Sequence, residues 1–131
     1  MVIDTSVLVA IALGESIQER LLDAMAAAKD RALSSMTLLE AGMVLRARFG
    51  DRSIPVLYQL VDELVTEVVA FDDIQARLAI RAFGRFGKGM GHKAQLNFGD
   101  CAVYALAESR GEPVLAIGLD FAATDLSCIE F

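Results

Sequence analysis

The sequence has 131 residues, 55% hydrophobic and 23% charged, and this length and composition predict one globular domain spanning residues 1–131. Its longest apolar runs fall well short of the roughly 18 residues that cross a bilayer, which excludes a membrane-spanning helix. The net charge of −6 argues against a general nucleic-acid binder, because such proteins are usually basic.

Short apolar stretches alternate along the chain with segments whose apolar residues recur at helical spacing. In chain order, these patterns predict a strand at 1–4, helices at 5–13 and 15–28, a strand at 32–35, helices at 36–49 and 53–66, a strand at 67–71, helices at 74–86 and 100–110, and strands at 114–117 and 127–131. Alternation of this kind is typical of an α/β fold in which helices cover both faces of a parallel sheet.

Residues 84–99 form the irregular part of the sequence. They hold five of the ten glycines together with the basic residues Arg85, Lys88 and Lys93. Such a density of glycine predicts a mobile loop.

The helix predicted at 53–66 carries more apolar residues than one sheet face can cover. One explanation is a helix held between two neighbours in the core. The other is that part of its surface packs against a second chain, and we favour this explanation.

Cysteine is sparse and shows no disulfide or metal-binding pattern. Cys101 and Cys128 are far apart in the sequence, and the N-terminal residues do not resemble a signal peptide. Two isolated thiols of this kind predict a reducing, cytoplasmic location.

Four acidic residues lie where predicted strands end or predicted helices begin. Asp4 and Asp120 follow strands, and Glu40 and Asp100 lie in first turns of helices. Each has a structural explanation, since Asp4 and Asp100 suit helix N-caps, Thr37–Glu40 matches a capping box, and Asp120 suits a turn. In a doubly wound sheet, however, all four positions share the edge where the strands end.

Carboxylates gathered at one edge repel each other unless a cation neutralises them. Oxygen ligands without clustered histidine or cysteine suit Mg²⁺ or Mn²⁺ better than Zn²⁺. Such an ion activates a bound water and stabilises charge on a phosphate, so the predicted chemistry is phosphodiester hydrolysis.

Four stretches of the chain carry a recognisable pattern, namely Val2-Ile3-Asp4-Thr5-Ser6, Leu39-Glu40-Ala41, Leu96-Asn97-Phe98-Gly99-Asp100-Cys101 with Tyr104-Ala105-Leu106-Ala107, and Gly118-Leu119-Asp120-Phe121-Ala122-Ala123-Thr124-Asp125. In this order they resemble PIN-domain ribonucleases, and more closely the VapC toxins of bacterial toxin–antitoxin pairs. The resemblance covers essentially the whole chain, and the Asn-Phe-Gly-Asp-Cys stretch is its most specific part.

The resemblance implies a three-layer α/β/α sandwich around a parallel sheet of about four to five short strands. It implies a Mg²⁺- or Mn²⁺-dependent endoribonuclease that forms a homodimer, cleaves structured RNA such as tRNA, and is inhibited by a cognate VapB-like antitoxin. The antitoxin's helix or tail would cover the active-site groove.

The resemblance also assigns site residues. Asp4, Glu40 and Asp100 match the three core metal-binding acids, and Asp120 matches the fourth. Ser6 or Thr5 would orient Asp4 or a metal-bound water, and Asn97 is similar to a polar residue near the site. We expect Lys88, Lys93 and Arg85 to contact the RNA backbone.

One position departs from the family pattern. Relatives commonly carry an acidic or amide residue directly before the fourth acid, where this chain has Leu119. Because of this difference, the sequence is compatible with a site for one metal ion or for two. Asp125 could compensate in part, although its expected role is to cap a turn.

Two other functions fit parts of the sequence. A catalytically silent PIN-like module that binds a partner would also use the apolar helix at 53–66. A phosphotransfer domain with Asp4 as the acceptor fits less well, because a haloacid-dehalogenase-type phosphatase has a second aspartate where this chain has Ser6.

Overall fold

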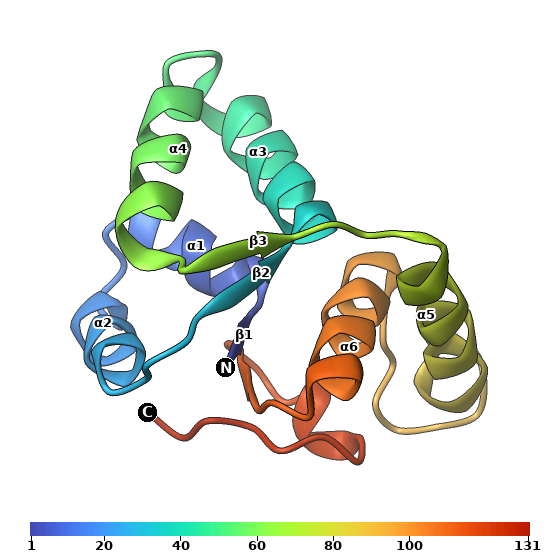
Figure 1. Cartoon of the computed structure of the whole chain (residues 1–131). Coiled ribbons are helices and arrows are strands. Elements are labelled where there is room, and N and C mark those ends of the chain that lie inside the picture. The colour runs from blue at the N-terminus through green and yellow to red at the C-terminus, as the bar shows by residue number, and fades with distance from the viewer.

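The computed structural model describes residues 1–131 and contains the six predicted helices and four of the five predicted strands (Figure 1). The strands are β1 (Val2–Ile3), β2 (Ala32–Ser34), β3 (Glu67–Val69) and β4 (Val114–Leu115). The helices are α1 (Thr5–Ala12), α2 (Gln18–Ala26), α3 (Ser35–Phe49), α4 (Ser53–Leu64), α5 (Asp73–Phe86) and α6 (Phe98–Arg110), and a short 3-10 helix, η1, covers Phe121–Ala123. None of the helices combines the length and the apolar character that a membrane crossing requires.

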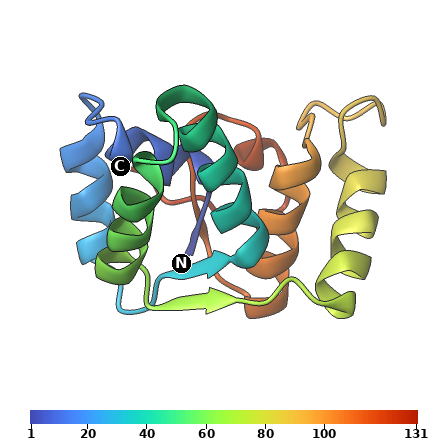
Figure 2. The ribbon, with the colours of Figure 1, turned by 90° about the horizontal axis from the view of Figure 1, so that it is seen from above.

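The four strands form one parallel sheet in the order β3-β2-β1-β4. Successive residues of a strand point to opposite faces, and two separate apolar clusters follow from this alternation. On one face α6 packs against the strands and α5 packs against α6, and the other face is covered by α1 to α4, as Figures 1 and 2 show. The first face presents Val2, Ala32 and Val114, and the second presents Ile3, Leu33 and Leu115. The predicted three-layer α/β/α sandwich is therefore confirmed.

The strand predicted at 127–131 is wrong. This segment forms a single isolated bridge, in which Cys128 pairs with Val114. Two backbone hydrogen bonds hold it, from Val114 N to Ser127 O at 2.9 Å and from Ile129 N to Val114 O at 2.8 Å. Because β4 contains only two residues, a neighbouring strand can pair with it over only a short length.

The glycine-rich loop is shorter than predicted. Gly84 lies within α5 and Gly99 within α6, so that the loop covers residues 87–97. A bridge between Gly87 and Leu96 closes its base. The loop is thus tied to the end of α5 and leads directly into α6.

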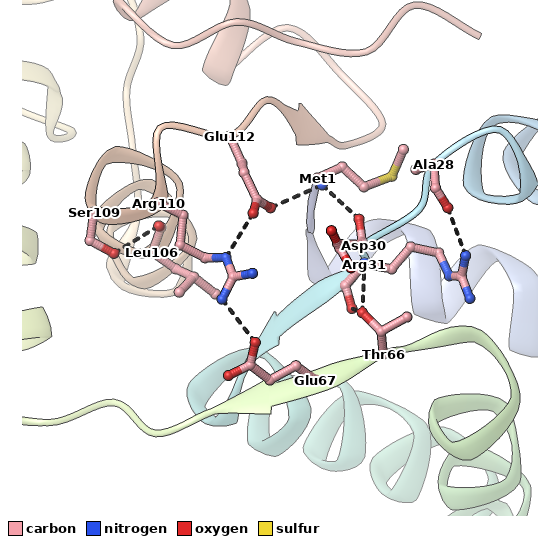
Figure 3. Close-up of polar contacts among 10 residues, drawn as sticks. All are labelled: Met1, Ala28, Asp30, Arg31, Thr66, Glu67, Leu106, Ser109, Arg110 and Glu112. Carbon is pink, nitrogen blue, oxygen red and sulfur yellow. Dashed lines mark hydrogen bonds and ion pairs between the residues drawn. The ribbon is translucent and has the colours of Figure 1, made fainter.

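A polar network closes the edge of the sheet where the strands begin (Figure 3). Arg110, the last residue of α6, contacts Glu67 at the start of β3 (2.9 Å) and Glu112 just before β4 (3.0 Å). Glu112 also pairs with the ammonium group of Met1 at 2.9 Å, and this group donates to the carbonyl oxygen of Asp30 at 2.8 Å. Arg110 and the Met1 ammonium group are therefore paired with acidic side chains, and Arg31 beside them donates to backbone carbonyl oxygens.

Candidate active site

The four predicted acidic residues meet at the carboxyl edge of the sheet. Asp4 follows β1, Asp120 lies in the turn after β4, Glu40 lies on the helix that follows β2, and Asp100 lies in the first turn of α6. The charges of the other three all act on Asp100. No three Asp, Glu, His or Cys side chains lie close enough together to coordinate one metal ion directly, so the four carboxylates are neighbours and not a closed cluster.

Asp4 ends β1 and caps α1. Its Oδ2 accepts hydrogen bonds from the backbone N of Ser6 at 2.9 Å and from Ser6 Oγ at 2.5 Å. Ser6 Oγ in turn accepts a hydrogen bond from Ile117 N at 3.0 Å. Ser6 therefore holds the Asp4 carboxylate and also the segment that follows β4.

Glu40 is held by a different hydroxyl. Thr5 Oγ1 donates to Glu40 Oε2 at 2.8 Å. The carboxylate lies over Gly99, where an added Cβ would stand 2.7 Å from Glu40 Cδ and closer still to Oε2. The predicted capping box at Thr37–Glu40 is wrong, because α3 follows β2 without a connecting loop and Ser34 caps it.

Asp100 is the reciprocal partner in a capping box and not the N-cap itself. Asn97 caps α6, and its Oδ1 accepts from Asp100 N at 3.0 Å. Asp100 Oδ2 accepts from Asn97 N at 2.8 Å. Asn97 thus fixes the carboxylate of Asp100 and leaves its Oδ1 free.

Asp120 is exposed and makes no side-chain hydrogen bond or ion pair. Leu119 beside it is 81% exposed and provides no polar ligand. Asp125 does not compensate, since it accepts from Tyr104 Oη at 2.6 Å and pairs with Arg85 at 2.7 Å. Its predicted role in capping a turn is also wrong, because both of its oxygens are bound to other helices.

None of the four carboxylates forms an ion pair with a basic group. Burial raises the pKa of Asp4, the hydrogen bonds from Ser6 and Thr5 oppose this shift, and the charge of Asp120 adds to it. Burial also raises the pKa of Asp100 to about 6, against the Asn97 hydrogen bond and with the repulsion of the other three acids. This concentration of uncompensated negative charge suits a cation.

Comparison with known proteins identifies the family. The PIN-domain family model matches residues 1–126. Ribonuclease VapC28 of Mycobacterium tuberculosis is 44% identical over 128 residues, which cover 95% of this chain and 93% of the relative. The chain belongs to the VapC family of PIN-domain ribonucleases.

Two solved structures share the VapC-family fold. VapC20 of Mycobacterium tuberculosis, a toxin that cleaves the sarcin-ricin loop, superposes with a TM-score of 0.75 at 20% identity and covers 98% of both chains. The DNA-bound VapBC complex of Salmonella typhimurium gives a TM-score of 0.71 at 25% identity, and the match covers 98% of this chain and 95% of that one.

For this VapC-family chain, we expect the stability of the metal-free protein to fall as the pH rises from about 4 to about 6. The pKa of Asp100 is about 6 in the folded state and 3.8 ordinarily. Over this range the folded chain keeps a proton that the unfolded chain has released, so the free energy of unfolding decreases with pH. Buried Asp4 acts in the same direction.

This expectation can be checked by urea unfolding in EDTA between pH 4 and pH 7. Asp100→Asn should reduce the slope of the free energy of unfolding against pH, because it removes one of the two carboxyl groups that cause this slope. Identical slopes for the variant and the wild type would contradict the assigned cause.

The predicted RNA-contacting residues of this VapC-family chain differ in availability. Lys88 and Lys93 are exposed, and neither forms an ion pair. Arg85 is paired with Asp125, and its guanidinium lies 4.5 Å from the ring centroid of Phe86. The two lysines of the 87–97 loop are therefore free to bind a phosphate, whereas Arg85 is occupied.

Two apolar grooves flank the acid centre. The first, of about 240 Å³, lies between α3 and α4 and exposes Leu39, Met43 and Tyr58. The second, of about 490 Å³, is lined only by apolar residues of α3, α5, α6 and the segment after β3. The broad apolar surface predicted for the helix at 53–66 thus divides into buried residues, such as Leu57, and an exposed side that forms part of the first groove.

Proposed function

We propose that this chain is an endoribonuclease that depends on Mg²⁺ or Mn²⁺ bound by Asp4, Glu40, Asp100 and Asp120. The observation that carries the proposal is the gathering of four carboxylates at one sheet edge with no basic partner. Each of them keeps at least one oxygen without a hydrogen bond. The family relationship to ribonucleases supports the same activity.

The donor chemistry of the residues present suits a hard cation. All four donors are carboxylates, and the absence of a side chain at Gly99 leaves room for Glu40 beside Asp100. A bound cation of this kind lowers the pKa of a water and stabilises negative charge on a phosphate. Because Leu119 is apolar and Asp125 is bound elsewhere, these four carboxylates form the whole acidic ligand set.

Three neighbouring polar residues prepare the carboxylates for this role. Ser6 holds Asp4, Thr5 holds Glu40 and Asn97 holds Asp100, each through one of the carboxylate oxygens. The remaining oxygen of each carboxylate is then presented in a fixed direction. Side chains oriented in this way bind metal ions more tightly than mobile ones.

We propose structured RNA, such as tRNA, as the substrate. VapC20, which has the same fold, is a toxin that cleaves the sarcin-ricin loop, and this supports a structured RNA target. Lys88 and Lys93 lie on the loop that leads into Asn97 and the acid centre, and they are the groups that we expect to contact the backbone phosphates.

We also propose that this chain acts in the cytoplasm and has a VapB-like antitoxin as its partner, as the VapBC complex of Salmonella typhimurium supports for the partner. The groove between α3 and α4 is lined by Leu38 and Leu39, which directly precede Glu40 in α3, and we propose that the antitoxin binds there. The second groove, between α5 and α6, supports the proposed homodimer, because its lining is apolar throughout.

Calorimetric titration with Mn²⁺ and a tRNA cleavage assay test the catalytic proposal together. We expect the wild type to bind Mn²⁺ and to cleave tRNA, with cleavage stopping in EDTA. Asp4→Asn and Glu40→Gln should lose both properties. Asp51→Asn is the matched control, since Asp51 is an exposed acid that pairs with Arg46. Cleavage that persists in EDTA would contradict metal dependence.

A catalytically silent partner-binding module is the second candidate. The two apolar grooves favour it, because they would serve a partner equally well without catalysis. It predicts no carboxylate-dependent binding of Mn²⁺, so the same titration separates the two functions. An aspartate phosphotransfer site is disfavoured, since Ser6, in place of a second aspartate, is hydrogen-bonded to Asp4.

A further inference from the structure

Asp125 lies outside the acid centre but makes two short contacts with other elements. Its Oδ1 accepts from Tyr104 Oη at 2.6 Å, and its Oδ2 lies 2.7 Å from Arg85 Nη2. The Tyr104 hydrogen bond and the Arg85 guanidinium hold the pKa of Asp125 below its ordinary value. The carboxylate is therefore charged at neutral pH, and both of its oxygens are engaged.

Tyr104 provides a fixed anchor for Asp125. Its side chain is 1% exposed, and its ring centroid lies 5.5 Å from that of Phe86. Tyr104 lies one helical turn after Asp100 on α6, so the two residues share one side of that helix. The contact thus joins Asp125 to the helix that carries one of the four acids.

The turn at residues 117–125 carries Asp120 between two attachment points. At its start, Ile117 N donates to Ser6 Oγ at 3.0 Å, and Ser6 holds Asp4. At its end, Asp125 binds Tyr104. In between, buried Phe121 anchors η1 in the core.

The side chain of Asp120 makes no contact that would fix it directly. Its place is set by the backbone of the turn, which Thr124 N closes by donating to Phe121 O at 2.9 Å. Gly118, with a φ of 107°, allows the turn to leave the Ile117 attachment point. The backbone of residues 121–124 is therefore the direct link between Asp125 and Asp120.

We propose that Asp125 is a positioning residue, which binds Tyr104 and thereby fixes the 117–125 turn so that Asp120 faces Asp4 and Asp100. The inference rests on the proposed metal-dependent function and adds a residue that does not itself belong to the ligand set. Arg85 contributes to the same attachment, because it pairs with Asp125 Oδ2.

Hydrogen exchange of the metal-free chain tests the positioning itself. Asp125→Ala and Tyr104→Phe should both speed amide exchange across residues 117–124. Arg81→Ala is the matched control, because it removes an ion pair between α5 and α6, with Glu108 at 3.0 Å, that does not touch the turn. Unchanged exchange across the turn in Asp125→Ala would overturn the proposal.

The affinity for Mn²⁺ tests whether Asp125, by fixing the turn, affects metal binding through Asp120. Asp125→Ala should weaken binding about tenfold, as the loss of a residue that orients a ligand commonly does. Asp125→Asn retains an acceptor for Tyr104 and should retain most of the affinity. In an Asp120→Asn background, Asp125→Ala should have no further effect.

If Asp125→Ala lowered the Mn²⁺ affinity equally in the wild type and in Asp120→Asn, the proposal would be overturned. Asp125 would then act on the stability of the whole chain and not through Asp120. A wild-type chain that fails to bind Mn²⁺ would instead contradict the proposed function. In that case, the exchange rates of the metal-free variants would still decide whether Asp125 fixes the turn.

Discussion

Asp100→Asn is expected to abolish metal-dependent RNA cleavage by this chain while the fold stays intact. The asparagine retains an oxygen that can accept from Asn97 N, so the capping box at the start of α6 is preserved. It removes a carboxylate whose pKa is raised to about 6 by burial and by three neighbouring acids. The metal-free variant should therefore be at least as stable as the wild type at neutral pH.

The expected loss of cleavage exceeds about a hundredfold, because losing a ligand should cost more than losing a residue that only orients one. Initial rates on tRNA at saturating Mn²⁺ measure it, and circular dichroism verifies the fold. Asp73→Asn is the matched control, since Asp73 also lies in the first turn of a helix but pairs with Arg77 in solvent. Wild-type cleavage by Asp100→Asn would contradict the role given to this carboxylate.

Gly99→Ala is expected to reduce cleavage about 10- to 100-fold without lowering stability. A Cβ at this position would lie 2.7 Å from Glu40 Cδ, so the carboxylate has to leave its place and its bond with Thr5. The displaced group is the end of a flexible side chain, so the helix can accept the new methyl group. Alanine also favours the helical state over glycine by about 1 kcal/mol.

Thermal unfolding and cleavage rates measured on the same preparation check this prediction. Gly84→Ala is the matched control, because Gly84 lies within α5 and a Cβ there meets no atom within 4 Å. It should gain the same helical stability and cleave at the wild-type rate. A Gly99→Ala variant that is as active as this control would show that the position of Glu40 beside Asp100 is unimportant.

The placement of the acids could be predicted from sequence because it depends only on topology. Asp4 and Asp120 follow apolar strands, and parallel strands end at one edge of their sheet. The alternation of short strands with helices was enough to predict that the sheet is parallel. Neither step required knowledge of a side-chain contact.

The supporting contacts could not be predicted in the same way. Both Ser34 and Thr37 are good N-caps, and the sequence does not show that β2 continues into α3 without a loop. Glu40 therefore matched a capping motif, although it binds Thr5 from a distant part of the chain. The contact of Asp125 with Tyr104 likewise arises only when η1 packs against α6.

The charged network around Arg110 bears on how this chain is degraded. Arg110, at the end of α6, pairs with Glu67 at the start of β3 and with Glu112 just before β4. These two strands are the outer strands of the sheet, so one side chain connects both of its edges. Strands of two or three residues have too few hydrogen bonds to open and close as separate units. We therefore expect the sheet to open in one cooperative step, so that proteolytic turnover follows the global free energy of unfolding.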